Sequence, residues 1–230
     1  IHSSNDFPTS AGLASSASGF AALITAINAH CELGLDHAMC SEWARVGSAS
    51  AARSIFGGFV ALVPPQWWAV PMAKKEHWPL EVVVAVTSTQ AKSVSSGKGM
   101  ECSRLTSPYY NAWLRDAAAD FTTASDAISR KDFAALGAVA ELSCLKMHSV
   151  MLTSRPTLSY WTPASITCMD RVRELRAEGN DVFFTVDAGP QIKAVCLPSS
   201  ADAVADALSK TPGVIKVIRS TLGDGARVLE

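Results

Sequence analysis

Apolar residues recur with the period of a helix in several segments of the chain. Phe20, Leu23, Ile24 and Ile27 are spaced as one face of a long helix, which follows a turn rich in Pro, Thr, Ser and Gly. Further segments with helical spacing are 37–46, about 104–151, 164–178 and 201–209. The longest of these predicts a largely helical stretch in the middle of the chain.

Short apolar runs flanked by turn residues predict strands between the helices. They cover 1–4, 55–63, 80–87, 182–187, 192–197 and 214–220. The Pro- and Trp-containing stretch at 64–78 separates two of these strands, and we interpret it as a hairpin insertion whose apolar surface is covered by Trp67, Trp68 and Trp78. This order of elements predicts an α+β fold of layered sheets and helices.

Composition restricts the class of ligand. With a formal net charge of -1, the chain has no basic excess to wrap nucleic acid or hold an anionic membrane, so phosphate binding requires a local site. The six cysteines form no CxxC pair, which argues against a zinc site or a disulfide framework. No apolar run approaches the ~20 residues of a membrane span. We therefore expect a cytoplasmic protein that binds a small phosphorylated molecule, without nucleic-acid or membrane partners.

The segment PTSAGLASSASG at 8–19 carries the strongest chemical signal. Gly12 permits a turn that presents successive backbone N–H groups, and the small residues from Ala14 to Ala17 let a phosphate approach the start of the helix. The helix dipole favours an anion there, and a serine hydroxyl can hold a phosphate-bound magnesium ion. The alternative is a serine-capped helix after a Pro/Gly turn. The extended order of the motif favours phosphate binding.

This loop resembles the phosphate-binding motif of the GHMP kinases, in the version carried by mevalonate diphosphate decarboxylases. The resemblance continues in order through GSASAARSIFGGFV at 47–60, VSSGKGM at 94–100, TSPYYNAWL at 106–114 and FFTVDAGP at 183–190. It implies a GHMP-kinase-like two-layer α/β sandwich at 1–90 and a C-terminal ferredoxin-like α+β domain at 91–230. It also implies that the chain lacks an N-terminal segment of roughly 80 to 100 residues, so that the first sheet is incomplete.

The resemblance assigns ATP binding to small residues of two segments. The implied phosphate contacts are Gly12, Leu13, Ala14, Ser15 and Ser16, together with Ser95 and Ser96, and Ser16 is also the implied contact for Mg2+. We expect residues 94–100 to form a mobile loop that closes over the phosphates, with Lys98 adding charge. By composition alone, this segment is equally consistent with a solvated Ser/Gly linker.

Substrate contacts are implied at Ser48, Ser50 and Arg53, because a guanidinium grips a carboxylate or phosphate through two parallel bonds. On general grounds, an arginine in a Ser/Ala run is more often a surface charge. Asp187 ends an apolar strand before Ala-Gly-Pro, where an aspartate commonly forms the turn. The resemblance makes it the catalytic aspartate, which accepts the proton of the substrate hydroxyl while Arg53 helps to keep it ionised. His148 lies among apolar residues and is interpreted as packed.

The resemblance implies an ATP- and Mg2+-dependent enzyme. It phosphorylates the 3-hydroxyl of mevalonate 5-diphosphate and then expels phosphate and CO2, giving isopentenyl diphosphate for isoprenoid and sterol synthesis. A homodimer is the habit of the family. The alternatives are a phosphomevalonate decarboxylase, a mevalonate 3-kinase of the same fold, and a catalytically silent binding module. A silent module predicts a broken phosphate loop or a missing aspartate, but the loop motif is intact and the aspartate is present here.

Overall fold

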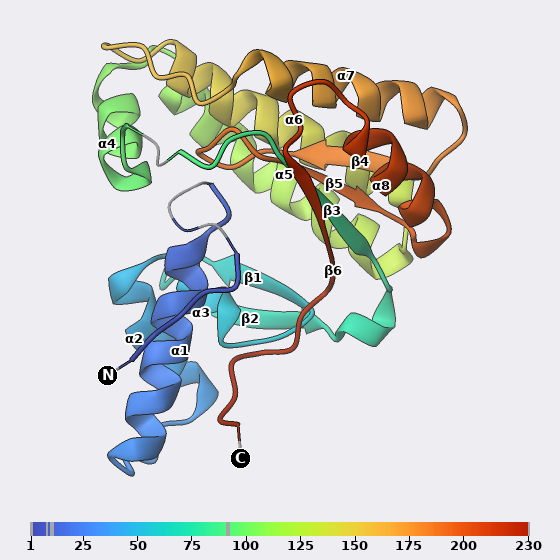
Figure 1. Cartoon of the computed structure of the whole chain (residues 1–230). Coiled ribbons are helices and arrows are strands. Elements are labelled where there is room, and N and C mark those ends of the chain that lie inside the picture. Colours follow the sequence, from blue (N-terminus) through green and yellow to red (C-terminus); the bar gives the residue numbers. More distant parts are fainter. Residues whose placement is uncertain (1, 8, 10–11, 91–92, 230) are drawn as a thin grey trace. The chain divides into compact units, whose positions relative to one another are not determined.

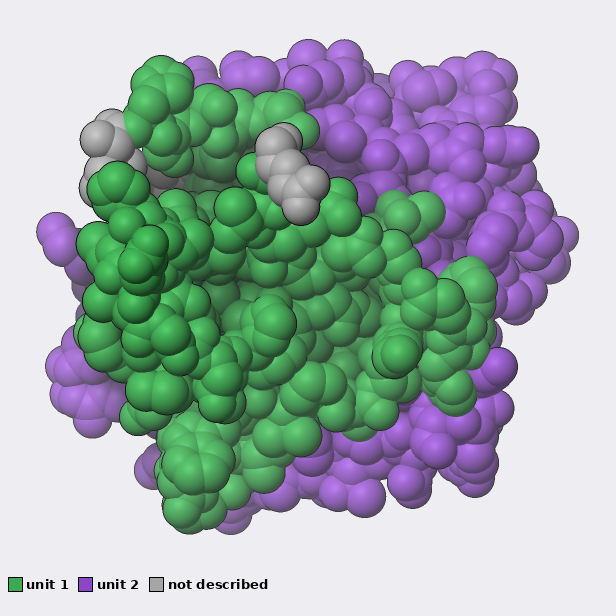
Figure 2. All heavy atoms as spheres, turned by 90° about the horizontal axis from the view of Figure 1, so that it is seen from below, with its two compact units in different colours: residues 1–79, 221–230 green, residues 80–220 purple. Residues whose placement is uncertain are grey.

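The computed structural model describes residues 2–7, 9, 12–90 and 93–229. The chain divides into two compact units, which Figure 2 colours separately. Unit 1 comprises Ile1–Pro79 and Thr221–Glu230, and unit 2 comprises Leu80–Ser220. The sequence placed the domain boundary after residue 90 and gave the C-terminal segment to the second domain, so both assignments differ from this division.

Unit 1 combines helices with a β-hairpin (Figure 1). Its described elements are α1 (Ser15–His30), α2 (His37–Gly47), α3 (Ala51–Ser54), β1 (Phe59–Val63), β2 (Trp68–Ala73) and the 3-10 turn η1 (Lys75–His77). The strands β1 and β2 pair antiparallel. The helices share a core of Ala21, Ile24, Cys40, Ala44, Ala51 and Ile55. Because most of these side chains are small, the three helices pack closely.

Unit 2 builds a sheet that is covered by helices (Figure 1). Its strands are β3 (Glu81–Val86), β4 (Val182–Thr185), β5 (Ile192–Cys196) and β6 (Lys216–Thr221). Its helices are α4 (Ser96–Thr106), α5 (Tyr110–Arg130), α6 (Phe133–Leu152), α7 (Pro163–Ala177) and α8 (Ala201–Ser209), with the 3-10 turn η2 (Pro198–Ser200). The described strands are ordered β4-β5-β3-β6, and β5 pairs antiparallel with both neighbours.

Alternation along the strands gives this sheet two chemically different faces. Phe184 and Ile192 are fully buried, and they pack in the main core cluster with Val172 of α7. On the opposite face, Thr185 of β4 lies directly across from Lys193 of β5. The first face therefore provides the main core cluster of the unit, whereas the second carries the polar pair Thr185 and Lys193 beside apolar residues such as Phe183.

Helix α6 lies along the outer edge of β4, the terminal strand of the sheet. Glu141 accepts the N–H of Phe184 at 3.1 Å, and the Cys144 sulfur contacts the N–H of Val186 at 3.3 Å. His148 Nε2 lies 3.1 Å from the carbonyl oxygen of Val186. The three side chains recur at i, i+3 and i+7, which places them on one face of the helix. A helix face thus satisfies backbone groups that a further strand would otherwise bind.

By length and composition, α6 also qualifies as a helix able to cross a membrane. This differs from the expectation that no apolar run approaches that length. The core helix of a globular domain passes the same test, and 39% of the relevant window of α6 is buried inside the protein. Its polar contacts with β4 are those of a packed core helix.

The C-terminal segment runs back through unit 1 beside the loop between α3 and β1. The N–H of Gly58 donates to Gly223 O at 3.1 Å, and the N–H of Ala226 donates to Ser54 O at 3.2 Å. These backbone bonds hold the segment next to the helix that carries Arg53. Residues distant in the sequence therefore complete the surroundings of α3.

Several predicted helices are confirmed. Segments 37–46 and 164–178 correspond to α2 and α7 with slightly shifted ends, and 201–209 corresponds to α8 with the same bounds. The helical patterns expected over about 104–151 are confirmed as the end of α4 followed by α5 and α6. Lys131 ends α5 in the left-handed conformation with a φ of 57°, and the Asp132 side chain caps the start of α6. These local signals interrupt a pattern that periodicity alone presents as continuous.

Two strand predictions require correction. No regular structure is present over residues 2–5, so the described part of the strand expected at 1–4 is absent. The strand expected at 55–63 begins only at Phe59. Gly58 precedes it with a φ of +71°, a conformation that turns the chain and favours glycine. The other predicted strands are present as β3, β4, β5 and β6, with shorter or shifted bounds.

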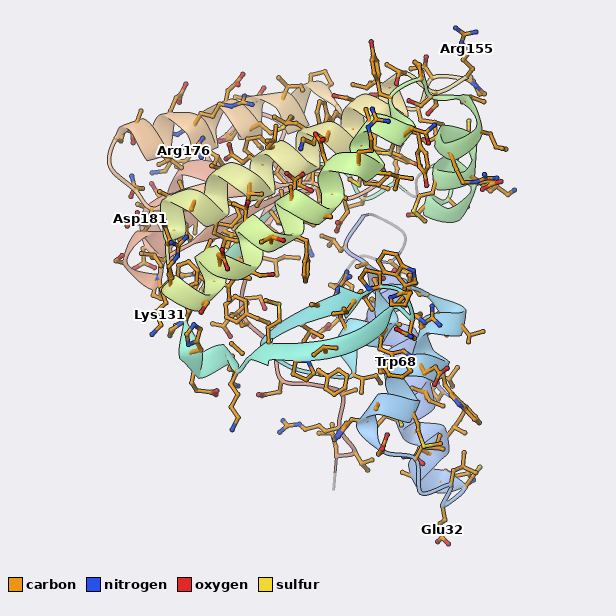
Figure 3. The ribbon with its side chains drawn as sticks, turned by 180° about the vertical axis from the view of Figure 1, so that it is seen from behind. Glu32, Trp68, Lys131, Arg155, Arg176 and Asp181 are labelled. Atoms are coloured by element: carbon orange, nitrogen blue, oxygen red, sulfur yellow. The ribbon has the colours of Figure 1, made fainter. Side chains whose placement is uncertain are left out.

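The predicted insertion at 64–78 does not form a hairpin by itself. Its strand β2 pairs with β1, which precedes it, so the hairpin turn lies at 64–67. Trp78 is buried and stacks on Phe59, as a covering residue should. Trp67 and Trp68 are 51% and 58% exposed, and Figure 3 labels Trp68. The expectation that all three tryptophans cover apolar surface therefore holds for Trp78 alone.

Candidate functional site

The start of α1 has the geometry of an anion-binding helix terminus. Gly12 has a φ of +80°, and Ala14 caps the helix in the left-handed conformation with a φ of 52°. Ala14 brings no side-chain cap to the helix, and no acidic residue lies in the first turn. The positive end of the helix dipole therefore faces no carboxylate of its own turn. Of the predicted motif, Pro8, Ser10 and Ala11 lie outside the described residues.

A row of serine hydroxyls connects this helix to the second predicted segment. Ser16 Oγ lies 3.3 Å from Ser48 Oγ, and Ser48 Oγ lies 3.1 Å from Ser50 Oγ. Gly47 allows the end of α2 to lie close to α1, because a Cβ at this position would lie 2.4 Å from the ring of Phe20 in α1. The structure thus brings a predicted ATP contact next to two predicted substrate contacts.

Ser50, at one end of this row, borders a cavity of about 1150 Å³ in unit 1. Its lining includes Ala14 at the start of α1, Ser50 and Arg53 of the α3 region, and Gly225 of the C-terminal segment. Arg53 is exposed, so its guanidinium is accessible to an anion. Ala14, Ser50 and Arg53 therefore bring a helix terminus, a hydroxyl group and a positive charge, which suit a phosphate group, to a cavity whose remaining lining is largely apolar.

Residues 94–100 are not the mobile loop that the sequence predicted. Ser95 is the N-cap of α4, and its hydroxyl accepts the N–H of Lys98 at 3.4 Å. Ser96 is the first residue of the helix. A Cβ at Gly99 would lie 2.8 Å from the hydroxyl of Tyr160, so this glycine allows close packing. The segment presents a second helix N-terminus, and its predicted contact with ATP stays a prediction.

Asp187 lies just beyond the end of β4, in a turn closed by a bond from Gly189 N–H to Asp187 O at 2.7 Å. Gln191 anchors this turn to the end of β3. Its side chain accepts the Thr87 N–H at 2.7 Å, donates to Ser88 O at 2.6 Å, and is completely buried. The backbone that carries the aspartate is therefore fixed from the neighbouring strand.

The side chain of Asp187 forms an ion pair that the sequence did not predict. Lys193 Nζ donates to Asp187 Oδ2 at 2.8 Å. The lysine side chain is 11% exposed and the aspartate side chain is 56% exposed. A single charge in the otherwise apolar strand IKAVC was the available signal. Its partner depends on strand register, which the sequence pattern does not supply.

His148 is packed beneath this turn, as the sequence predicted. It is 2% exposed, and its ring lies 4.4 Å from the ring of Trp161. Burial lowers the pKa of His148 from its usual value, while the carbonyl of Val186 and the charge of Asp187 act in the opposite direction. The neutral imidazole can donate from Nε2 to Val186 O. His148 therefore holds the strand end that precedes Asp187.

The predicted residues fall into both units. Ser16, Ser48, Ser50 and Arg53 belong to unit 1, and Asp187 belongs to unit 2. The prediction that Arg53 helps to keep Asp187 ionised joins the two units and stays a prediction. Within the described ranges, no group of three or more His, Cys, Asp or Glu side chains is arranged to hold a metal ion.

Family models match both parts of the chain. The diphosphomevalonate decarboxylase-like N-terminal domain matches residues 1–66, and the mevalonate 5-diphosphate decarboxylase C-terminal domain matches residues 82–227. Diphosphomevalonate decarboxylase of Debaryomyces hansenii is 38% identical over 200 residues, which are 83% of this chain and 52% of that protein. The chain thus spans about half the length of this curated relative.

Solved structures show the same similarity. Mevalonate diphosphate decarboxylase from Staphylococcus aureus is 35% identical with a TM-score of 0.88, over 97% of this chain and 69% of that chain. A structure described as MDDEF in complex with MVAPP, AMPPCP and magnesium is 36% identical with a TM-score of 0.84, over 95% of this chain and 68% of that chain. These similarities support the α+β, GHMP-kinase-like fold predicted from the sequence.

Proposed function

The chain belongs to the mevalonate diphosphate decarboxylase family, and on that premise we propose that its full-length protein converts mevalonate 5-diphosphate to isopentenyl diphosphate. ATP phosphorylates the 3-hydroxyl, and loss of phosphate and CO2 then forms the alkene. The observation that carries the proposal is the row of hydroxyls from Ser16 through Ser48 to Ser50 beside the start of α1. This row links the N-terminus of α1, which is suited to the phosphates of a nucleotide, to Ser48 and Ser50, which are suited to a second anion.

The described residues fit the phosphates of ATP at the start of α1. The left-handed Ala14 directs the chain into the helix without a side-chain cap, so backbone N–H groups of the first turn can bind an anion. The Ser16 hydroxyl is suited to a phosphate-bound Mg2+. When bound, Mg-ATP would supply the phosphoryl group that turns the 3-hydroxyl into a leaving group. Ser95 and Ser96 are proposed as further phosphate contacts at the start of α4.

The substrate would be held by Ser48, Ser50 and Arg53. The two hydroxyls offer neutral donors without bulk, and the guanidinium can bind a carboxylate or diphosphate through parallel bonds. Asp187 would orient the 3-hydroxyl and accept its proton. In a loose phosphoryl-transfer transition state the alcohol loses its proton late, so positioning of this carboxylate contributes more than base strength.

We also propose that the protein is a cytoplasmic homodimer that supplies isoprenoid and sterol synthesis. All six cysteines are free thiols, which suits a protein of a reducing compartment such as the cytoplasm. The proposal of a homodimer rests on the oligomeric state that the family resemblance implies. Sedimentation of the full-length protein tests it, since a monomer at micromolar concentration would contradict the proposal.

The decisive experiment incubates full-length protein with ATP, Mg2+ and mevalonate diphosphate and measures CO2 and ADP. Wild-type protein is expected to release both in equal amounts, and Asp187→Asn is expected to release neither at a comparable rate. Asp181→Asn is the matched control, because Asp181 is an exposed aspartate of the same unit, labelled in Figure 3.

Other outcomes identify the alternatives. Release of ADP without CO2 indicates a 3-kinase of the same fold. Turnover of mevalonate monophosphate in preference to the diphosphate indicates a phosphomevalonate decarboxylase. No turnover of any mevalonate phosphate contradicts the proposed activity, and a rise in melting temperature with Mg-ATP would then indicate a binding module, because a ligand selective for the native state stabilises it.

A further inference from the structure

The ion pair between Lys193 and Asp187 combines a covered cation with an accessible anion. The lysine side chain is only 11% exposed, whereas the aspartate side chain is 56% exposed. Two exposed partners gain little from pairing, but a largely covered ammonium loses hydration and needs a compensating contact. The 2.8 Å bond to Asp187 Oδ2 supplies such a contact. The pair is therefore more than an incidental surface contact.

Strand register directs the lysine toward the aspartate. Lys193 lies directly opposite Thr185 in the antiparallel pair of β4 and β5, and directly opposite Val84 in the pair of β3 and β5. Residues opposite one another in an antiparallel pair share a face of the sheet. Asp187 lies two residues beyond Thr185 and is reached by a diagonal contact from the same face. The lysine stem is thus flanked by β3 and β4, which limits where the ammonium can lie.

We propose that Lys193 is a positioning residue, which acts by fixing the carboxylate of Asp187 through Oδ2. This inference rests on the proposed function, in which Asp187 accepts the proton of the 3-hydroxyl. With Oδ2 bound to the lysine, Oδ1 is the oxygen directed to the substrate. Lys193 itself does not touch the reacting atoms. Its removal leaves the carboxylate in place but free to rotate, which lowers the fraction of bound substrate in a reactive geometry.

Kinetics of the full-length protein test this assignment. Lys193→Met keeps an apolar stem of similar length, and we expect kcat to fall about 10- to 100-fold, as for a misplaced catalytic group. KM for mevalonate diphosphate should stay within about threefold, since substrate affinity is assigned to other residues. Lys193→Arg keeps a donor for the carboxylate and should restore most of kcat. Lys210→Met is the matched control, because this exposed lysine also pairs with an aspartate, Asp206.

A double-variant cycle separates positioning from general damage to the fold. If Lys193 acts through Asp187, then Lys193→Met should change kcat less than about twofold when Asp187→Asn is already present. Equal losses in both backgrounds would overturn the proposal, and so would a Lys193→Met protein with wild-type kcat. A loss of kcat that follows the unfolded fraction, and that Lys193→Arg does not restore, would also overturn it.

A second readout does not depend on turnover. In protein labelled with 13C at aspartate carboxyl carbons, Asp187→Asn identifies the signal of Asp187. This signal should shift in Lys193→Met and remain near its wild-type position in Lys193→Arg. An unchanged signal in Lys193→Met refutes the pairing. If the wild type is inactive but the signal shifts as expected, the proposed function fails while the fixing of the carboxylate by Lys193 stands.

Discussion

The carboxylate of Glu141 joins the backbone of β4 to helix α7. Its Oε1 atom accepts the N–H of Phe184 at 3.1 Å, and both carboxylate oxygens accept bonds from Arg176, labelled in Figure 3. The glutamate side chain is 14% exposed, so the strand-edge N–H it binds is largely shielded from water. A charged side chain is therefore part of the packing of this edge.

Replacing Glu141 by Leu should destabilise the protein. The Phe184 N–H would lose its acceptor, at a cost of about 1–3 kcal/mol for a shielded donor. Each kcal/mol corresponds to a fall of about 2–4 °C in melting temperature for a domain of this size. Glu141→Gln retains an acceptor oxygen and should lose less. The control is Glu174→Gln, which removes one partner of an exposed ion pair. An equal fall in melting temperature for Glu174→Gln and Glu141→Leu would contradict this prediction.

His148 should make stability depend on pH. Burial lowers its folded pKa below the usual value of 6.5, so the unfolded chain binds a proton that the folded protein resists. Stability contributed by the neutral imidazole is present above about pH 6.5 and decreases as the pH falls toward the folded pKa. The charged groups that face the ring are Asp187, which raises its pKa, and Lys193, which lowers it.

Thermal unfolding of wild type and His148→Gln from about pH 7.5 to pH 5 measures this effect. Glutamine retains an N–H donor for Val186 O but does not titrate in this range. As the pH falls, the melting temperature of the wild type should decrease more than that of His148→Gln. The exposed His30→Gln variant is the control. Parallel pH profiles for wild type and His148→Gln would show that this histidine does not cause the dependence.

Gly225 should tolerate no side chain, because a Cβ there would lie 2.4 Å from the carbonyl oxygen of Ile55. Gly225→Ala must push the C-terminal segment away from the α3 region, at a cost of about 1–3 kcal/mol. Gly223→Ala is a closely matched control, since a Cβ at Gly223 meets nothing within 4 Å. Limited proteolysis and thermal unfolding should distinguish the two variants. Equal stability would indicate that the segment does not pack as described.

Removing the middle hydroxyl of the serine row should weaken substrate binding. Ser48→Ala eliminates the group that lies within hydrogen-bond distance of both Ser16 and Ser50. Loss of one or two neutral hydrogen bonds predicts a rise in KM for mevalonate diphosphate of about 3- to 30-fold in the full-length protein. The control is Ser125→Ala, whose hydroxyl bonds only to its own helix at Phe121 O among the contacts described. An unchanged KM would argue against a substrate contact at Ser48.

The sequence alone predicted the secondary structure correctly where local residue preferences determine it. The helix at 201–209 was predicted with the bounds it has, since periodicity and the flanking turn residues agree. The segment 94–100 shows the opposite case. Its Ser/Gly composition is typical of a loop, but Ser95 caps a helix and Gly99 makes room for Tyr160. Composition does not distinguish a glycine needed for packing from one needed for mobility.

The candidate site was predicted only as far as single residues allow. The motif at 8–19 identified the start of α1, yet the contact between Ser16 and Ser48 depends on how α1 and α2 pack. Lys193 was missed because its relation to Asp187 follows from the pairing of β4 with β5. Tertiary packing and strand register determine such contacts, and neither is encoded by a short motif.

The division of the chain also constrains the order in which it folds during synthesis. Residues of unit 1 stand on both sides of unit 2 in the sequence: Ala226 bonds to Ser54 at the end of α3, and Gly223 bonds to Gly58 in the loop that follows. Unit 2 is continuous and has all its residues outside the ribosome before those bonds can form. The general tendency of N-terminal regions to fold first is therefore reversed at this point. The surroundings of Arg53 are completed only when the last part of this segment emerges.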